Sequence, residues 1–284
     1  MLILDSPTAM RAWSQGRRTS SRTTIGLVPT MGALHDGHLA LIDAAAQRCE
    51  LVVVSIFVNP LQFNRTDDFD LYPRPLDDDL AQCRARDVAA IYAPTPDSMY
   101  PRDFETNVCP GSLADPLEGV GRPGHFRGVT TVVAKLFNAV APDVAVFGRK
   151  DVQQLSLIER MVADLDMPIE IVGVDTVREP DGLAMSSRNR RLTPELRAAA
   201  VVVPRALEAA VAAARARPRA DPEALRRHAI EVIDAEPHAR LEYFELVDPS
   251  TLREPTRDDG PLLAVTAIWF DDVRLIDNRL IPHS

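Results

Sequence analysis

The stretch "VPTMGALHDGH" (residues 28–38) ends an apolar run and places two histidines on either side of an Asp-Gly pair. The run "IGLVP" (25–29) is typical of a buried strand, and apolar residues three and four apart predict a helix from about Gly37. A strand, a glycine-containing turn and a helix start often form a phosphate site, because the first helical N–H groups lack partners in the helix. His35 and His38 are three residues apart, so they project to one side, where both can reach a polyphosphate.

The composition indicates a globular chain without a nucleic-acid face. Its 284 residues are 46% hydrophobic with a formal net charge of −9, whereas a phosphate backbone requires clustered Lys and Arg. We find no apolar stretch of the roughly 18 residues that a membrane helix needs, and no charged n-region of a signal peptide. Cys49, Cys83 and Cys109 are odd in number and lack metal-ligand spacing, which predicts free thiols in a reducing cytoplasm.

Alternating strand-like and helix-like segments predict the fold of the first part of the chain. Helical patterns such as Leu155, Ile158 and Val162 lie between short, β-branched apolar runs. This alternation is typical of an α/β fold with a Rossmann-like, doubly wound parallel sheet, in which ligands bind beyond the carboxyl ends of the strands. The runs that we expect to form strands are 25–29, 51–58, 89–93, 144–148 and 169–174.

The pattern changes after Val174. A polar segment is followed by alanine-rich helices, the first of which begins near Thr193-Pro194 and is expected to kink or split at Pro204. Two runs late in the chain then predict antiparallel strands, at 241–247 and 262–270. We therefore expect two domains: a Rossmann-like domain at 1–176 and a smaller α+β C-terminal domain at 177–284.

Three further stretches carry side chains suited to a small anionic ligand. "FGRKD" (147–151) ends a strand, and its Lys150 is a compact charge suited to phosphate oxygens. "VNPLQF" (58–63) offers neutral amides, which hydrogen-bond carboxylates and hydroxyls. "MSSR" (185–188) supplies two hydroxyls and a guanidinium in a loop that can grip a triphosphate and release it.

Each pattern also has a purely structural interpretation. The two histidines can simply cap their helix, and "MSSR" can be a solvated linker. Asp151 and Gln154 have capping-box spacing. Asn59-Pro60 is a common turn former, which explains Asn59 well but leaves Gln62 unexplained. A zinc site at the histidines is less well supported, because no third ligand stands nearby in the sequence.

Two stretches receive no assigned chemistry. Asp77–Asp79 precede a helical pattern, where negative charge is favourable. We expect a solvated helix start there, with a peripheral divalent ion at Asp78 and Asp79 as the alternative. "GRPGHFRG" (121–128) is bracketed by glycines, so we expect a loop near the site. Its residues that add positive charge are Arg122, His125 and Arg127.

Five motifs together resemble a known family. His-x-Gly-His at 35–38 resembles the signature of Rossmann-like nucleotidyl-transferring enzymes, which include class I aminoacyl-tRNA synthetases. With "SIFVNPLQF" (55–63), "RPGHFRGVTTVVAKLFN" (122–138), "VFGRKDVQQL" (146–155) and "DGLAMSSRNRRL" (181–192), it resembles the pantothenate synthetases over nearly the whole chain. The resemblance implies ATP- and Mg²⁺-dependent condensation of D-pantoate with β-alanine through a pantoyl adenylate, releasing AMP and pyrophosphate. It also implies a cytoplasmic homodimer.

The resemblance implies a role for individual residues. The acid is expected to contact Gln62, Gln154, Met31 and Asn59, and the catalytic residues are expected to be His38, His35 and Lys150. The Mg²⁺ is expected to be held mainly by the ATP phosphates, so the metal-ligating residues stay unknown. ATP is expected to contact Pro29, Thr30, Met31, Gly32, His35, Gly37, His38, Gly148, Arg149, Lys150, Asp151, Val177, Met185, Ser186, Ser187 and Arg188.

The motifs leave rival functions open. One is a nucleotidyltransferase that stops at adenylation, and another is a non-catalytic ATP-binding sensor. A tRNA synthetase is disfavoured, because the chain is acidic and shows no anticodon-reading domain. Because the C-terminal domain carries "MSSR" whereas the first carries both histidines and the lysine, we expect the second domain to act as a lid.

Overall fold

A computed structural model describes residues 1–18, 23–216, 221–256 and 260–281. The chain forms two compact units, which are described separately below. The first comprises Met1–Arg149 and Gln153–Asp175, and the second comprises Lys150–Val152 and Thr176–Ser284.

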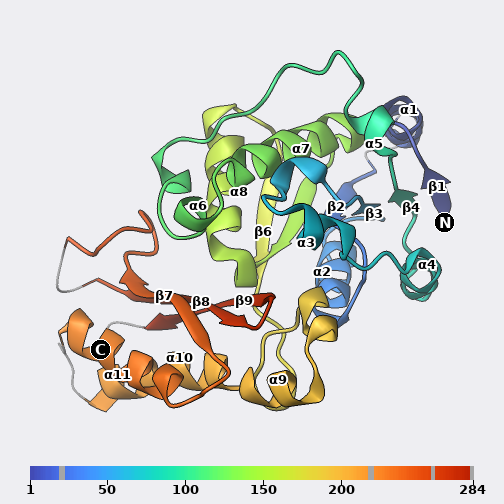
Figure 1. The fold of residues 1–284 in the computed structure, drawn as a ribbon. Helices are drawn as coiled ribbons and strands as arrows, with labels where there is room; N and C mark the ends of the chain where they lie inside the picture. Colours follow the sequence, from blue (N-terminus) through green and yellow to red (C-terminus); the bar gives the residue numbers. More distant parts are fainter. Residues whose placement is uncertain (19–22, 217–220, 257–259, 282–284) are drawn as a thin grey trace. The chain divides into compact units, whose positions relative to one another are not determined.

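The first unit is built on a six-stranded parallel sheet (Figure 1). The strand order is β1-β4-β3-β2-β5-β6, so the chain runs outward from β2 through β3 and β4 and then returns to the other side of β2 at β5. The predicted Rossmann-like, doubly wound α/β fold is therefore confirmed. The strands are β1 (Leu2–Leu4), β2 (Ile25–Thr30), β3 (Leu51–Ile56), β4 (Ala90–Tyr92), β5 (Val144–Gly148) and β6 (Glu170–Val174).

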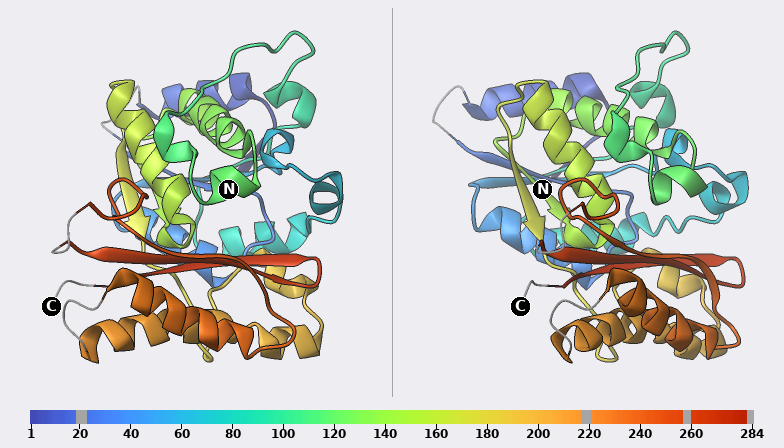
Figure 2. Two further views of the ribbon diagram at one scale, coloured as in Figure 1. Left: turned by 60° about the vertical axis from the view of Figure 1, so that its left-hand side comes forward. Right: turned by 90° about the vertical axis from the view of Figure 1, so that its left-hand side faces the viewer.

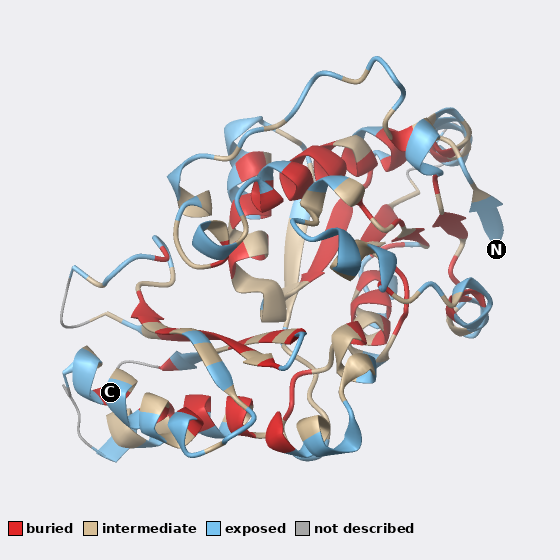
Figure 3. Ribbon diagram, viewed as in Figure 1, coloured by how far each residue is buried: buried red, intermediate tan, exposed pale blue. Residues whose placement is uncertain are grey.

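Helices cover both faces of this sheet, which explains why its central strands are almost continuously apolar. Val53 of β3 packs with α1, α7 and α8, whereas its neighbours Val52 and Val54 pack with α2 and α4 on the opposite face. Figure 3 shows the central strands and much of α7 as buried. The helices of the first unit are α1 (Pro7–Arg18), α2 (Asp36–Ala46), α3 (Thr66–Asp70), α4 (Leu76–Arg84), α5 (Pro96–Met99), α6 (Glu118–Gly121), α7 (His125–Val140) and, from Gln153, α8 (Val152–Asp164), with short 3-10 turns η1 (Pro60–Gln62) and η2 (Ser112–Ala114). The turn η3 (Arg149–Asp151) joins β5 to α8, and its Lys150 and Asp151 belong to the second unit.

The second unit packs helices on one face of an antiparallel three-stranded sheet, ordered β7-β8-β9 (Figure 2). Its core is formed by residues such as Phe244, Phe270 and Leu207. The predicted helix after Thr193 is split, because α9 ends at Ala199 and α10 begins at Val202, with Pro204 in the first turn of α10. The elements are η4 (Ser187–Arg191), α9 (Pro194–Ala199), α10 (Val202–Ala216), α11 (Pro222–Asp234), β7 (Arg240–Val247), β8 (Leu262–Phe270) and β9 (Val273–Ile281).

Candidate functional site

Two of the predicted nucleotide stretches follow neighbouring strands of the first unit. β2 and β5 lie side by side in the sheet, and the chain reverses its direction of strand addition between them. In doubly wound sheets this switch point opens a crevice at the carboxyl ends of the strands. The histidine turn follows β2, and Gly148 ends β5. A β-carbon on Gly148 would meet nothing within 4 Å in the described structure, so the space beside this backbone is open.

The turn after β2 has an unusual backbone. Gly32 and Ala33 both have positive φ values, 81° and 50°. A β-carbon on Gly32 would lie 2.9 Å from a carboxylate oxygen of Asp79, so both its conformation and its surroundings require glycine. Thr30 supports the turn, because its hydroxyl donates to the Ser55 carbonyl (2.7 Å) and accepts from the Gly32 N–H (3.1 Å).

Asp79 corrects one prediction from the sequence. We expected a solvated carboxylate at the start of a helix, but Asp79 in α4 is only 1% exposed. Its two oxygens accept hydrogen bonds from the backbone N–H groups of Ala33 (2.8 Å) and Leu34 (2.7 Å). A buried carboxylate that accepts from two amides makes charge-assisted hydrogen bonds, and here it fixes the turn that leads into His35. Asp77 and Asp78 are exposed, as expected.

The first histidine caps its helix through one ring nitrogen. His35 is the N-cap of α2, and its Nδ1 accepts from the Gly37 N–H at 3.1 Å. Because Nδ1 accepts this bond, the neutral ring carries its proton on Nε2. The rings of His35 and His38 lie against each other, with centroids 4.1 Å apart. The capping interpretation and the phosphate interpretation are therefore compatible.

The "VNPLQF" stretch forms a turn held by α7. Asn59 is 1% exposed and caps η1, and its amide donates to Gln62 Oε1 (2.9 Å) and to the Gly128 carbonyl (3.1 Å). Gln62 Nε2 lies 3.3 Å from the Met31 sulfur, which brings the amide to the histidine turn. A β-carbon on Gly128 would lie 2.3 Å from the Leu61 carbonyl oxygen, so only glycine permits this approach.

The expected loop at 121–128 is wrong over its second half. α7 begins at His125, after Gly124 in the left-handed conformation (φ 80°), because "HFRGVTTVVAKLFN" continues the buried apolar helix face. His125 Nδ1 contacts the Gln62 carbonyl at 2.7 Å, and Arg122 donates to the same oxygen at 3.2 Å. These side chains therefore hold the Gln62 backbone, whereas Arg127 is exposed.

The two adjacent glutamines of α8 have different surroundings. Gln153 is 3% exposed and fully engaged, accepting from Glu118 N–H (3.1 Å) and donating to the carbonyls of Leu113 (2.9 Å) and Pro116 (2.8 Å). Gln154 is half-buried, and within the described ranges its side chain makes no hydrogen bond. The capping-box interpretation of Gln154 is therefore not supported.

Lys150 falls in the second unit with Asp151. Its ammonium lies 3.8 Å from the Asp151 carboxylate, and its backbone carbonyl accepts from the Asn278 side chain at 2.8 Å. Asn278 follows Asp277, which is almost fully buried and pairs with Arg178 at 2.7 Å. The network of β9 thus holds the backbone that carries Lys150.

The "MSSR" segment is more ordered than a linker. Met185 N–H donates to the Val177 carbonyl at 3.0 Å, so the two predicted nucleotide contacts face each other across a tight hairpin. Ser186 caps η4 by accepting from the Arg188 N–H at 3.2 Å, and Ser187 is buried.

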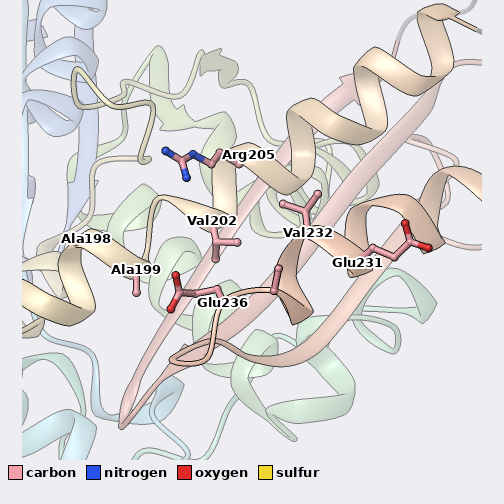
Figure 4. Close-up of a pocket in the computed structure, with 8 residues that line it drawn as sticks. Ala198, Ala199, Val202, Arg205, Glu231, Val232 and Glu236 are labelled. Atoms are coloured by element: carbon pink, nitrogen blue, oxygen red, sulfur yellow. The ribbon is translucent and has the colours of Figure 1, made fainter.

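Other features of the described ranges do not point to a second centre. A pocket of about 440 Å³ between the end of α9, α10 and the end of α11 is lined by none of the predicted site residues (Figure 4). The carboxylates of Glu231 and Glu236 point away from each other there. Across residues 1–18, 23–216, 221–256 and 260–281, no group of three or more His, Cys, Asp or Glu side chains is placed to hold a metal ion. None of the helices in these ranges is long and apolar enough to cross a membrane.

The parallel sheet, its switch point and the histidine turn at the end of β2 define a nucleotide-binding α/β protein of the Rossmann-like class. The family model for pantoate-beta-alanine ligase matches residues 2–280. The chain belongs to the pantoate-beta-alanine ligase family.

Relatives and solved structures agree with this assignment. Pantothenate synthetase 1 of Bradyrhizobium diazoefficiens is 52% identical over 279 residues, covering 96% of this chain and 95% of the relative. A crystal structure of pantothenate synthetase from Thermus thermophilus matches with a TM-score of 0.92 and 43% identity, covering 99% of this chain and 100% of that one. A Francisella tularensis pantoate-beta-alanine ligase, solved as a complex with beta-gamma ATP and beta-alanine, matches with a TM-score of 0.81 and 33% identity over 99% and 97% of the two chains.

Proposed function

We propose that this chain joins D-pantoate to β-alanine at the expense of ATP, through a pantoyl adenylate. The observation that carries the proposal is the placement of the histidine turn and of Gly148 at one switch point, in a chain that belongs to this ligase family. A free carboxylate does not acylate an amine at a useful rate, because oxide is a poor leaving group. An adenylate supplies AMP as the leaving group.

The reaction has two steps, adenylation of the acid and transfer of the acyl group to the amine. A pantoate carboxylate oxygen attacks the α-phosphorus of ATP, and the bond to the pyrophosphate oxygen breaks. The amine of β-alanine then attacks the acyl carbon of the adenylate, loses a proton and expels AMP. The protein must therefore align the carboxylate with the α-phosphorus, and stabilise charge on the departing pyrophosphate.

The histidines are suited to the second task. His35 Nε2 carries the proton in the neutral ring, because Nδ1 is engaged with Gly37. A donor at a helix start can stabilise negative charge on a phosphoryl oxygen as it develops. We assign this role to His35, His38 and Lys150. Ser186, Ser187 and Arg188 are proposed to bind the triphosphate, and Val177 and Met185 to flank the nucleotide.

The amides are suited to the first task. Gln62 lies beside Met31 of the histidine turn, and Gln154 has an uncommitted side chain within the described ranges. Neutral amides hydrogen-bond a carboxylate without trapping it as an ion pair, so the acid stays nucleophilic. We propose that Gln62 and Gln154 hold pantoate.

The remaining proposals concern the setting of the reaction. We propose that Mg²⁺ is bound mainly through the ATP phosphates, the usual mode for this ion at nucleotide sites. The three free cysteines fit a reducing cytoplasm. We further propose that the second unit acts as a lid, and that two copies associate as a homodimer, as the family resemblance implies.

An assay of AMP release tests the function. Wild-type protein with ATP and Mg²⁺ should release AMP only when pantoate and β-alanine are both present, and pyrophosphate exchange into ATP should require pantoate alone. AMP release without β-alanine at the full rate would identify a different acceptor. Absence of pantoate-dependent exchange would favour the ATP-binding sensor.

Variants of the proposed charge-stabilising residues test the mechanism. His38→Ala and Lys150→Ala should each lose about 2–4 kcal/mol of transition-state stabilisation, which is roughly 30- to 900-fold in kcat, with smaller changes in KM. His228→Ala removes an exposed histidine of α11 and serves as the matched control, with kcat unchanged. Near-normal turnover of either site variant would remove that residue from the mechanism.

A further inference from the structure

The amide of Asn59 is fixed in one orientation by two backbone groups. The Leu61 N–H can only donate, so the atom that it contacts at 3.3 Å must be the amide oxygen, Oδ1. The Gly128 carbonyl can only accept, so the atom at 3.1 Å from it must be Nδ2. These two contacts independently give the same orientation, and a flipped amide would lose both.

The orientation of Gln62 follows from that of Asn59. Asn59 Nδ2 donates at 2.9 Å, so its partner on Gln62 must be the oxygen, Oε1. The amide nitrogen of Gln62 is therefore the end that points away from Asn59. Within the described residues, its one acceptor is the thioether of Met31, which is a weak acceptor. Gln62 thus presents an N–H donor beside the histidine turn.

Tyr100 completes this arrangement from a distant part of the chain. Its hydroxyl lies 2.8 Å from Asn59 Oδ1 and must donate to it. With this bond, the Asn59 amide uses both lone pairs and both N–H groups within the protein. Asn59 therefore has no remaining capacity to bind a substrate directly in this arrangement.

The tyrosine ring is itself held in place. Its centroid lies 6.1 Å from that of Phe57 and 5.0 Å from that of Phe104. The Lys135 ammonium lies 5.7 Å from the ring centroid. Burial raises the pKa of the Tyr100 hydroxyl above its ordinary value, so the hydroxyl stays protonated at neutral pH and can donate a hydrogen bond.

We propose that Tyr100 is a positioning residue for the acid substrate, acting through Asn59 to keep the Gln62 amide nitrogen turned toward Met31 of the histidine turn. The amide then offers a hydrogen-bond donor to an acceptor oxygen of the acid, a carboxylate or hydroxyl oxygen. Tyr100 is separated from Asn59 by 41 positions, and in this proposal it acts on the acid only through the two amides. The inference rests on the proposed function for the identity of that acid.

Tyr100→Phe tests the proposal, with Tyr92→Phe as a matched control. Tyr92 is a fully buried tyrosine of the same unit, but its hydroxyl has no hydrogen-bond partner in the described structure. Loss of the Tyr100 hydroxyl should raise the KM for pantoate about 3- to 10-fold, with the KM for ATP unchanged. The reason is that the hydrogen bond that orients Asn59, and through it Gln62, is removed. The Tyr92 variant should match wild type in both constants.

A double mutant separates positioning from a general structural effect. Gln62→Ala removes the group through which Tyr100 is proposed to act. Adding Tyr100→Phe to Gln62→Ala should therefore cause no further rise in the KM for pantoate, whereas independent effects would multiply. Circular dichroism and thermal unfolding establish that each variant is folded.

The outcomes distinguish the two proposals. Wild-type protein that releases no AMP with pantoate and β-alanine would overturn the proposed function. In active enzyme, a Tyr100→Phe variant that behaves like Tyr92→Phe overturns only the positioning role. Equal rises in the KM values for pantoate and ATP, or multiplying effects in the double mutant, also overturn it.

Discussion

Replacing Asp79 with asparagine should loosen the turn that leads into His35 and His38, to which we assign charge stabilisation. The Asp79 carboxylate is 1% exposed and accepts from two backbone N–H groups, those of Ala33 and Leu34. Asparagine keeps one acceptor oxygen but puts an N–H₂ group against the second backbone N–H. Two donors then face each other in a buried position.

The magnitude follows from the bonds that change. A hydrogen bond to a charged group contributes about 1.5–3 kcal/mol, and a buried donor left without an acceptor costs about 1–3 kcal/mol. Asparagine is neutral, so the substitution also removes the cost of desolvating a buried charge, and this offsets part of the loss. We therefore expect Asp79→Asn to lower the free energy of unfolding by about 2–4 kcal/mol. The positive φ of Ala33 adds to the effect, because this strained conformation persists only when its surroundings enforce it.

Two measurements check this expectation. Urea unfolding gives the change in stability, and pantoate-dependent pyrophosphate exchange gives the effect on adenylation, measured well below the unfolding midpoint. Asp78→Asn is the matched control, because Asp78 is the exposed neighbour and should change stability by less than about 0.5 kcal/mol. If Asp79→Asn unfolds at the wild-type urea concentration and exchanges pyrophosphate at the wild-type rate, the carboxylate does not hold the turn.

Three further predictions concern other parts of the chain. Gly128→Ala should raise the KM for pantoate while leaving the KM for ATP unchanged, because its β-carbon would displace η1; unchanged kinetics would show that η1 can move aside. Asp277→Ala should lower the free energy of unfolding by about 3–5 kcal/mol, because it leaves Arg178 charged and half-buried without its partner; calorimetry measures this loss. In thiol labelling of the native protein at pH 8, exposed Cys109 should react first. Burial raises the pKa of Cys83 to about 11, so its thiolate is scarce at pH 8 and its labelling should require unfolding.

The fold and the motif positions were predictable because their signals are local. A strand such as β5 is apolar over its whole length since both faces are covered, and its bounds match the expected 144–148. The helix after His35 is indicated by residues three and four apart. The short edge strand β1 was not predicted, because it is three residues long, two of them exposed, and is defined only by pairing with β4. The assigned roles of the site residues stay predictions.

The supporting residues were not predictable, because their partners are distant in the sequence. Asp79 contacts an amide 46 positions away, and Tyr100 an amide 41 positions away. Asp79 looked like its exposed neighbours, since a run of three acidic residues does not show which one faces inward. A burial signal was available: Leu80 and Cys83 are apolar and lie one and four positions after Asp79, which places it beside the buried face of α4.

The adjacent glutamines of α8 show how far periodicity alone can go. Successive helical residues point about 100° apart, so Gln153 and Gln154 cannot both face the same pocket. Leu155 and Ile158 mark one buried face, which places Gln154 at its edge and Gln153 on the opposite side of the helix, although Gln153 is the buried one. The difference between the two glutamines comes instead from the distant segment 113–118, whose backbone groups hydrogen-bond both the oxygen and the nitrogen of the Gln153 amide. Gln154 is left with an uncommitted amide within the described structure, and a ligand that needs a neutral amide on this helix must therefore use Gln154.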